Sequence, residues 1–160
     1  MADSGTPRTE LSRAAFDRLT QELEDLSTRG RLELATAIER ARELGDLSEN
    51  ADYHAAKDDQ GRMEARIRQI QALLDGAVIL DESVSASDVV ASGSVVSLRY
   101  QGDDDVERYL VGSIEERRDD LNVISPASPL GSVLIGRRAG ETVQYEAPDG
   151  MLAVEIVEVG

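Results

Sequence analysis

The sequence predicts an α+β protein, in which an N-terminal antiparallel α-helical coiled-coil hairpin precedes a small, mostly antiparallel β domain. Two observations lead to this fold class. Apolar residues recur at helical spacing as far as residue 74, whereas after residue 88 they form short segments that alternate apolar with polar residues. We therefore expect four parts: a disordered tail at 1–9, the hairpin at 10–76, a linker at 77–91 and the β domain at 92–160.

In the first helical segment, apolar residues are spaced so that they form one narrow stripe, but the heptad phase of this stripe is interrupted once. Gly30 bridges the gap between two periodic runs and breaks the heptad phase in the manner of a stutter. Glycine also weakens a helix interior by roughly 1 kcal/mol relative to alanine, so a slight bend is expected there. The two runs consist of Phe16, Leu19, Leu23 and Leu26, followed by Leu34, Ile38, Ala41 and Leu44.

The second helical pattern starts near Ala51 and ends at Asp75-Gly76, because glycine commonly follows the last residue of a helix. Two long amphipathic helices separated by a few residues must fold back on each other. With one narrow stripe each, they form an antiparallel coiled coil, a rod on the order of 45 Å long. The stripe of the second helix contains Ala56, Met63, Ile67, Ile70 and Leu74.

The β domain is predicted from short segments rich in Val, Leu, Ile and Tyr. Turn residues separate these segments, among them Gly102-Asp103 and Pro148-Asp149-Gly150. A short helix is expected near Leu134. The predicted strands are 94–100, 106–112, 121–125, 142–146 and 152–159.

Composition excludes several classes of protein. Cysteine is absent, which excludes disulfides, thiolate metal sites and a cysteine nucleophile. Only 3% of the 160 residues are aromatic, so the core is expected to consist mainly of aliphatic side chains. No run approaches the ~20 apolar residues that cross a bilayer, and the N-terminus lacks the apolar stretch of a secretory signal. We expect a cytoplasmic protein with no membrane partner.

The charge balance also limits the partners. The chain has 32 acidic against 17 basic residues, a net charge of -15, and both halves are acidic. Affinity for a nucleic acid backbone needs clustered Lys and Arg. No strong independent binding to nucleic acid is therefore expected, and any contact must be local or arranged by a protein partner.

The turn of the hairpin contains the residues that could carry chemistry. Gly45 ends the first helix, and Asp46, Glu49 and Asp52 follow within seven positions. Two carboxylates three residues apart, at a turn that opens a helix, can point the same way. Mg²⁺ commonly takes one or two carboxylates and keeps several waters. These acids cannot complete a site, but they could donate ligands to a metal that is held mainly by another molecule.

A purely structural interpretation of the same residues remains open. An Asp or Ser before a helix with Glu three residues later forms a capping box, which needs no function, and spacing alone favours this explanation. The basic residues Arg40, Arg42 and Lys57 could meet a phosphate or form a solvated helix face. Tyr53 could pack at the tip or contact a partner, with packing favoured, and His54 is expected at the surface.

Three segments carry a resemblance to a known family. Residues 41–67, ARELGDLSENADYHAAKDDQGRMEARI, resemble the signature of the bacterial Gre transcript-cleavage factors of the GreA type, A-R-E-x-G-D-L-x-E-N-A-x-Y. Residues 128–140, SPLGSVLIGRRAG, are similar to a second element of that family. The closing segment 145–159, YEAPDGMLAVEIVEV, is similar to its final hairpin. The resemblance covers almost the whole chain.

The resemblance implies an accessory factor rather than an independent enzyme. In this family the coiled-coil hairpin enters the secondary channel of RNA polymerase, and an FKBP-like C-terminal domain docks at the channel mouth. The tip acids help to hold the second catalytic Mg²⁺, so that the polymerase cleaves a nascent RNA whose 3′ end has backtracked. The factor alone binds no cofactor. The matching residues are Asp46 and Glu49 for metal and water, Asn50 and Tyr53 for the shape of the tip, Arg42 and Lys57 for the RNA, and Ser128 and Pro129 for docking on the polymerase.

The chain departs from the family pattern at a few positions, none of them Asp46 or Glu49. Arg62 stands where Phe is usual, Pro126 stands where an aromatic residue is common, and Glu141 replaces an Asp. These changes concern packing, docking and RNA contact.

Two alternative functions remain. A channel-binding regulator could inhibit the polymerase instead of stimulating cleavage, although the intact D-L-S-E-N tip argues against this. An FKBP-like fold could also indicate a peptidyl-prolyl isomerase, but fold does not determine function. Such a site needs an aromatic-lined pocket, and residues 83–160 contain only Tyr100, Tyr109 and Tyr145 as aromatics.

Overall fold

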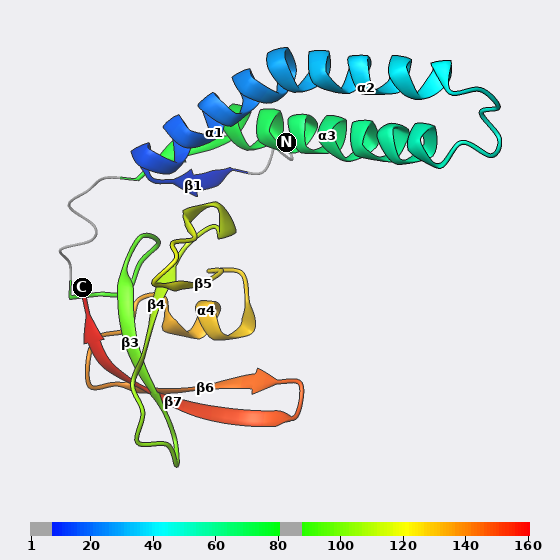
Figure 1. Ribbon diagram of the computed structural model, residues 1–160. Coiled ribbons are helices and arrows are strands. Elements are labelled where there is room, and N and C mark those ends of the chain that lie inside the picture. Colours follow the sequence, from blue (N-terminus) through cyan, green and yellow to red (C-terminus); the bar gives the residue numbers. More distant parts are fainter. Residues whose placement is uncertain (1–7, 81–87) are drawn as a thin grey trace, which may run out of the picture. The chain divides into compact units, whose positions relative to one another are not determined.

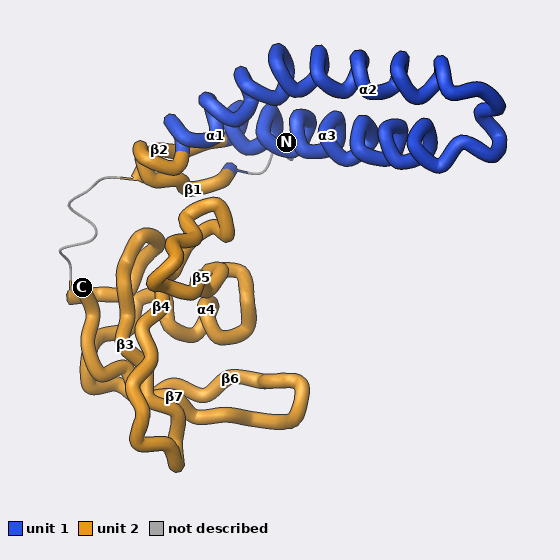
Figure 2. Tube along the Cα trace, viewed as in Figure 1, with its two compact units in different colours: residues 1–8, 16–76 blue, residues 9–15, 77–160 orange. Residues whose placement is uncertain are grey.

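A computed structural model describes residues 8–80 and 88–160 of the chain. The chain divides into two compact units (Figure 2). The first comprises residues 1–8 and 16–76, and the second comprises residues 9–15 and 77–160. The first unit is helical and the second is built on a β-sheet, which confirms the predicted fold class.

The first unit is a helical hairpin whose two arms run antiparallel (Figure 1). The first arm consists of α1 (Arg13–Asp25), η1 (Leu26–Gly30) and α2 (Arg31–Glu43), and the second arm is α3 (Ala51–Asp75). The first three residues of α1 belong to the second unit. The apolar stripes predicted from the sequence face each other and form the seam between the arms, except that Leu44, expected at the end of the first stripe, is 70% exposed. Its most buried members are Leu19, Ile38 and Ala41 on the first arm and Ala56, Ile67 and Ile70 on the second.

The interruption predicted at Gly30 is a π-helical turn, η1. The Arg31 N–H bonds to the Leu26 carbonyl, five residues earlier, whereas an α-helix spans four. Gly30 also lies close to the second arm, because a Cβ at this position would be only 3.0 Å from the Met63 sulfur. The sequence therefore located the irregularity correctly but did not reveal its form.

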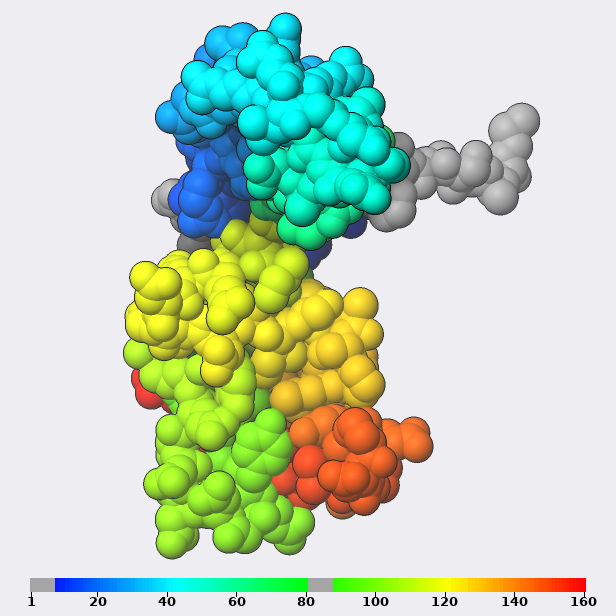
Figure 3. Space-filling view, turned by 45° about the vertical axis from the view of Figure 1, so that its right-hand side comes forward, coloured from blue at the N-terminus to red at the C-terminus, as the bar shows by residue number. Residues whose placement is uncertain are grey.

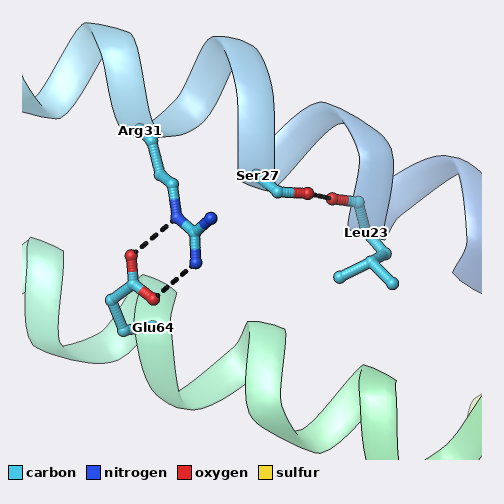
Figure 4. Close-up of polar contacts among 4 residues, drawn as sticks. All are labelled: Leu23, Ser27, Arg31 and Glu64. Carbon is cyan, nitrogen blue, oxygen red and sulfur yellow. Dashed lines mark hydrogen bonds and ion pairs between the residues drawn. The ribbon is translucent and has the colours of Figure 1, made fainter.

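Two ion pairs join the arms on either side of η1. Arg31 donates to both carboxylate oxygens of Glu64, at 2.9 and 3.0 Å (Figure 4). Arg66 donates in the same way to Glu22, at 2.7 and 2.9 Å. Such bidentate pairs have a defined geometry, so they favour one register of the two arms.

A two-stranded parallel sheet was not predicted. β1 (Thr9–Leu11) pairs with β2 (Ala77–Ile79), with Thr9 opposite Ala77. The sequence pattern places the first segment at the end of the tail and the start of the hairpin, and the second in the linker. Residues 1–7 of the expected tail and 81–87 of the expected linker lie outside the described residues.

The second unit contains a five-stranded sheet with the strand order β5-β4-β3-β7-β6. All five predicted strands and the short helix near Leu134 are confirmed. Contrary to a purely antiparallel arrangement, β4 and β5 are parallel. The elements are β3 (Val95–Tyr100), β4 (Glu107–Val111), η3 (Ile114–Glu116), β5 (Asn122–Ile124), α4 (Pro129–Leu134), β6 (Thr142–Ala147) and β7 (Gly150–Val159).

The core of this unit is aliphatic, as the composition predicts. Val96, Leu98 and Ile156 are fully buried on the sheet, and Leu134 of α4 packs into the same cluster. Figure 3 shows one face of this unit, coloured from green near β3 through yellow to red near β7. None of the helices in the described residues is both long and apolar enough to span a membrane.

The three tyrosines of the second unit pack against this core. Burial, together with a hydrogen bond to Tyr100, raises the pKa of Tyr145 to about 12. Burial and hydrogen bonds to Glu107 and Tyr100 likewise raise the pKa of Tyr109. The hydroxyl groups of Tyr109 and Tyr145 therefore stay protonated at neutral pH.

Candidate functional site

The two arms are joined by a short connection, residues 44–50. Gly45 has a φ of +113°, in the left-handed region that residues other than glycine rarely adopt. A Cβ at this position would meet nothing within 4 Å, so the backbone conformation, and not crowding, explains the glycine. The chain thereby leaves α2 and exposes the following residues.

Asp46 is held by the residue two positions later. Its Oδ1 accepts hydrogen bonds from the backbone N–H of Ser48 at 3.0 Å and from the Ser48 hydroxyl at 2.8 Å. These bonds favour the charged carboxylate and lower the pKa of Asp46, the backbone bond most. Asp46 is therefore an ionised, exposed group with a defined position in the loop.

Asp46 and Glu49 lie around one hollow of about 360 Å³ at the tip, which Asp52 also lines. Glu49 is exposed. The structure therefore brings together the two acids that the sequence singled out. Among residues 8–80 and 88–160, no group of three or more His, Cys, Asp or Glu is arranged to hold a metal ion. Two carboxylates suit Mg²⁺ as partial ligands, and a complete site needs ligands from elsewhere.

The capping interpretation is wrong for both acids. The residue that begins α3 is Asn50, whose Oδ1 accepts the Tyr53 N–H at 3.0 Å. Its Nδ2 donates to the Ala41 carbonyl on the other arm. Asp46 and Glu49 are therefore not needed to cap the N-terminus of α3.

Tyr53 is half-buried, in agreement with a packing role. The guanidinium of Arg42 lies 5.8 Å from the centre of its ring, within the range of a cation–π contact. The His54 ring meets Tyr53 edge-on at 5.7 Å, and His54 is exposed as predicted. Asn50 and Tyr53 thus both make contacts beside the tip, and their role in shaping it stays a prediction.

Arg42 and Lys57 come together, although they belong to different arms. Both line a hollow of about 550 Å³, together with Glu39, Glu43 and Gln60. The Lys57 ammonium donates to the Gln60 side chain at 3.0 Å. The two cations can meet an anion, but the neighbouring acids reduce the positive potential.

Known proteins resemble the chain over nearly its whole length. Residues 9–79 match the family described as transcription elongation factor, N-terminal, and residues 85–160 match transcription elongation factor, GreA/GreB, C-term. The chain belongs to the GreA/GreB family of transcription elongation factors. This confirms the resemblance seen in the tip signature.

Individual relatives of this GreA/GreB chain agree. Transcription elongation factor GreA of Saccharopolyspora erythraea is 46% identical over 148 residues, which is 92% of this chain and 90% of the relative. GreA of Nautilia profundicola is 40% identical over 149 residues, 93% and 92% of the two chains. A crystal structure of GreA factor homolog 1 from Thermus thermophilus is 31% identical, covers 96% of this chain and 99% of its own, and has a TM-score of 0.44.

Ser128 and Pro129, in the second GreA/GreB element, have a clear structural role. Ser128 begins α4: its hydroxyl accepts the Gly131 N–H at 3.0 Å and donates to the Ser125 carbonyl at 2.7 Å. Pro129 occupies the first turn, where its missing N–H costs nothing. A Cβ at Gly131 would be 1.9 Å from the Ser125 oxygen, so the turn requires glycine there. Docking by Ser128 and Pro129 stays a prediction.

Sequence reasoning missed Ser48, the residue that orients one tip acid of this GreA/GreB factor. The sequence signal for this hydrogen bond is an Asp that is followed two residues later by a Ser. Asp side chains commonly accept such a bond from their own backbone two residues on.

Proposed function

We propose that this chain binds RNA polymerase in the bacterial cytoplasm through the polymerase's secondary channel and stimulates the polymerase's own cleavage of backtracked nascent RNA. In this proposal the chain is an accessory factor and has no catalytic centre of its own. The observation that carries the proposal is the shared hollow at the tip, where Asp46 and Glu49 are both exposed and neither caps a helix.

The hairpin supplies reach. The tip joins the C-terminal end of α2 to the N-terminal end of α3. A rod of two helices can enter a channel that is too narrow for a folded domain. At 1.5 Å per residue, the 25 residues of α3 span roughly 37 Å.

The tip acids fit a metal that is shared with the polymerase. In two-metal phosphoryl chemistry, one ion activates the attacking water and the other stabilises the leaving oxygen. Asp46 and Glu49 would hold the more weakly bound Mg²⁺ together with polymerase ligands. Asp46 is kept ionised by Ser48, and Glu49 can orient a water through its carboxylate.

The hollow that Arg42 and Lys57 line fits a local contact with RNA. Arg42 and Lys57 would meet phosphates of the extruded 3′ end only after the hairpin is in place, because a chain of net charge -15 is repelled by free RNA. The partner protein, and not the charge of the factor, brings the RNA to these residues.

The test uses stalled, backtracked elongation complexes with labelled RNA and measures the release of short 3′ fragments at saturating factor. Asp46→Asn and Glu49→Gln remove the charge and keep the size of each side chain. Each should reduce stimulated cleavage on the order of 100-fold, the usual cost of losing one electrostatic group at a reacting centre. Binding to polymerase should change little.

Asp52→Asn is the matched control, because Asp52 lines the same hollow and has no assigned role. It should retain stimulation. Slowed synthesis with the parent chain would support an inhibitory regulator and overturn the proposal, as would full stimulation by Asp46→Asn and Glu49→Gln.

A further inference from the structure

The second arm keeps a strict heptad phase along its whole length. Its seam-facing positions alternate spacings of three and four residues, as in a regular coiled coil. Three of them are almost fully buried, at 7% exposure for Ala56, 2% for Ile67 and 0% for Ile70. The complete set is Tyr53, Ala56, Gln60, Met63, Ile67, Ile70 and Leu74.

The first arm contains one residue too many for the same phase. Its seam runs through Leu19, Leu23, Leu26 and Gly30 at spacings of four, three and four, and the strict pattern would continue at 33, 37 and 40. The residues on the seam are instead Leu34, Ile38 and Ala41, each one position later. In a regular α-helix, one extra residue turns everything after it by about 100° around the axis.

The π turn lies where this excess must be absorbed. A turn closed between Leu26 and Arg31 contains one residue more than an α turn. The segment after it therefore returns to the seam, and Ile38 and Ala41 are only 9% and 4% exposed. Figure 4 shows this stretch: Ser27 donates to the Leu23 carbonyl, and Arg31 reaches Glu64 directly after the turn.

We propose that η1 is a phase corrector: it compensates for one residue inserted between the seam positions Leu26 and Leu34, and so sets the direction in which α2 and the tip acids face. Glu22–Arg66 before the turn and Arg31–Glu64 after it hold the corrected register. The consequence for Asp46 and Glu49 rests on the proposed function. The correction of phase itself does not.

Leu32 is the residue whose deletion tests this inference. It lies between Gly30 and Leu34 and is 70% exposed, so its side chain contributes little to the seam. Deleting it leaves Gly30 in place and moves Leu34, Ile38 and Ala41 to the strict heptad positions. The first arm can then be α-helical throughout. Leu32→Ala controls for loss of the side chain alone.

Deletion of Ala65 is the matched control on the other arm. Ala65 is exposed in α3, between Met63 and Ile67, where the phase is already strict. Its removal turns one half of the seam away from its partner. The thermal midpoint of the full chain, followed by helical circular dichroism, should fall by more than about 10 °C. For the Leu32 deletion it should equal or exceed that of Leu32→Ala.

Equal losses in midpoint for the two deletions would overturn the inference. Such a result would mean that Gly30 alone, and not an inserted residue, causes the π turn. A cleavage assay at saturating factor tests the positioning of the tip: the Leu32 deletion should keep the plateau of the parent. A stable but inactive deletion variant would contradict the positioning. If the parent itself fails to stimulate cleavage, the proposed function fails while the midpoints still decide the correction of phase.

Discussion

The side-chain amide of Asn50, which begins the second arm, donates a hydrogen bond to the backbone carbonyl of Ala41, in the last turns of the first arm. The same amide accepts the Tyr53 N–H through its oxygen. One side chain thus bonds to a carbonyl near the end of α2, which also accepts the Leu44 N–H at 3.2 Å, and to an N–H in the first turn of α3, a group that helices leave without an internal partner. Asn50 thereby connects the two arms next to the tip acids.

Asn50→Ala should lower the free energy of unfolding by about 2 kcal/mol, since it removes a helix cap and a hydrogen bond worth about 1 kcal/mol each. Asn50→Ser keeps the cap and loses only the bond to Ala41, so it should cost about half as much. Denaturant unfolding followed by helical circular dichroism measures both. Equal costs for the two variants would show that the bond to Ala41 contributes nothing.

The role of Asn50 illustrates the limits of the sequence at the tip. The exposure of Asp46 and Glu49 could be predicted, because a turn between two long helices presents its polar residues to solvent. The cap was assigned to the wrong residue, since Asp, Ser and Asn all occur within five positions and each is a good cap. Only the backbone conformation of the loop decides among them, and tertiary contacts such as Asn50 with Ala41 fix that conformation.

Glu22 and Arg66 couple the stability of the hairpin to pH. The hydrogen bond from Arg66 lowers the pKa of Glu22 below its ordinary value of 4.5. A carboxyl whose pKa is lower in the folded state stabilises the fold above its unfolded pKa. This contribution is fully present above a pH of about 4.5, and it is lost as the pH falls from there through the lower pKa that Glu22 has in the folded state.

Glu22→Gln should therefore reduce stability at neutral pH by about 0.5–1 kcal/mol and flatten its decline on acidification. The effect is small because the side chains of Glu22 and Arg66 are 39% and 30% exposed, so solvent screens the pair. Asp58→Asn is the control, as the Asp58–Arg62 pair is 75% exposed on both sides and should contribute almost nothing. Melting curves from neutral pH to pH values below 4.5 provide the comparison. An unchanged pH dependence in Glu22→Gln would contradict the coupling.

The second unit was predictable where local signals exist and not elsewhere. Strand alternation and turn residues placed β3 to β7 within a few residues of their observed ends. The pairing of β1 with β2 has no local signal, because each strand has three residues and Thr9 and Ala77 are far apart in the sequence. The parallel direction of β5 against β4 was missed for the same reason, since it depends on the path through η3.

A buried carboxylate completes the cap of α1 from a distant part of the sequence. Ser12 accepts the Ala15 N–H through its hydroxyl at 3.1 Å, as the first residue of a capping box does. The partner acid normally lies three residues later, but alanine occupies that position. Glu116, 104 positions away, takes its place: it accepts the Ser12 N–H and the Ser12 hydroxyl, both at 2.7 Å. All three residues belong to the second unit.

Ser12 and Glu116 should therefore act as one unit in stability. Glu116 is only 8% exposed, so Glu116→Ala leaves the Ser12 N–H without its acceptor in a partly buried site and should cost about 2 kcal/mol. Ser12→Ala should cost a similar amount, because it removes the cap as well as one bond to the carboxylate. The double variant should cost about 1–2 kcal/mol less than the sum of the two, since each single change already breaks the shared interaction.

Glu146→Ala, at an exposed position of the same unit, is the control and should leave the free energy of unfolding unchanged within about 0.5 kcal/mol. Additive costs for Ser12→Ala and Glu116→Ala in denaturant unfolding would show that the two residues do not stabilise the fold through each other.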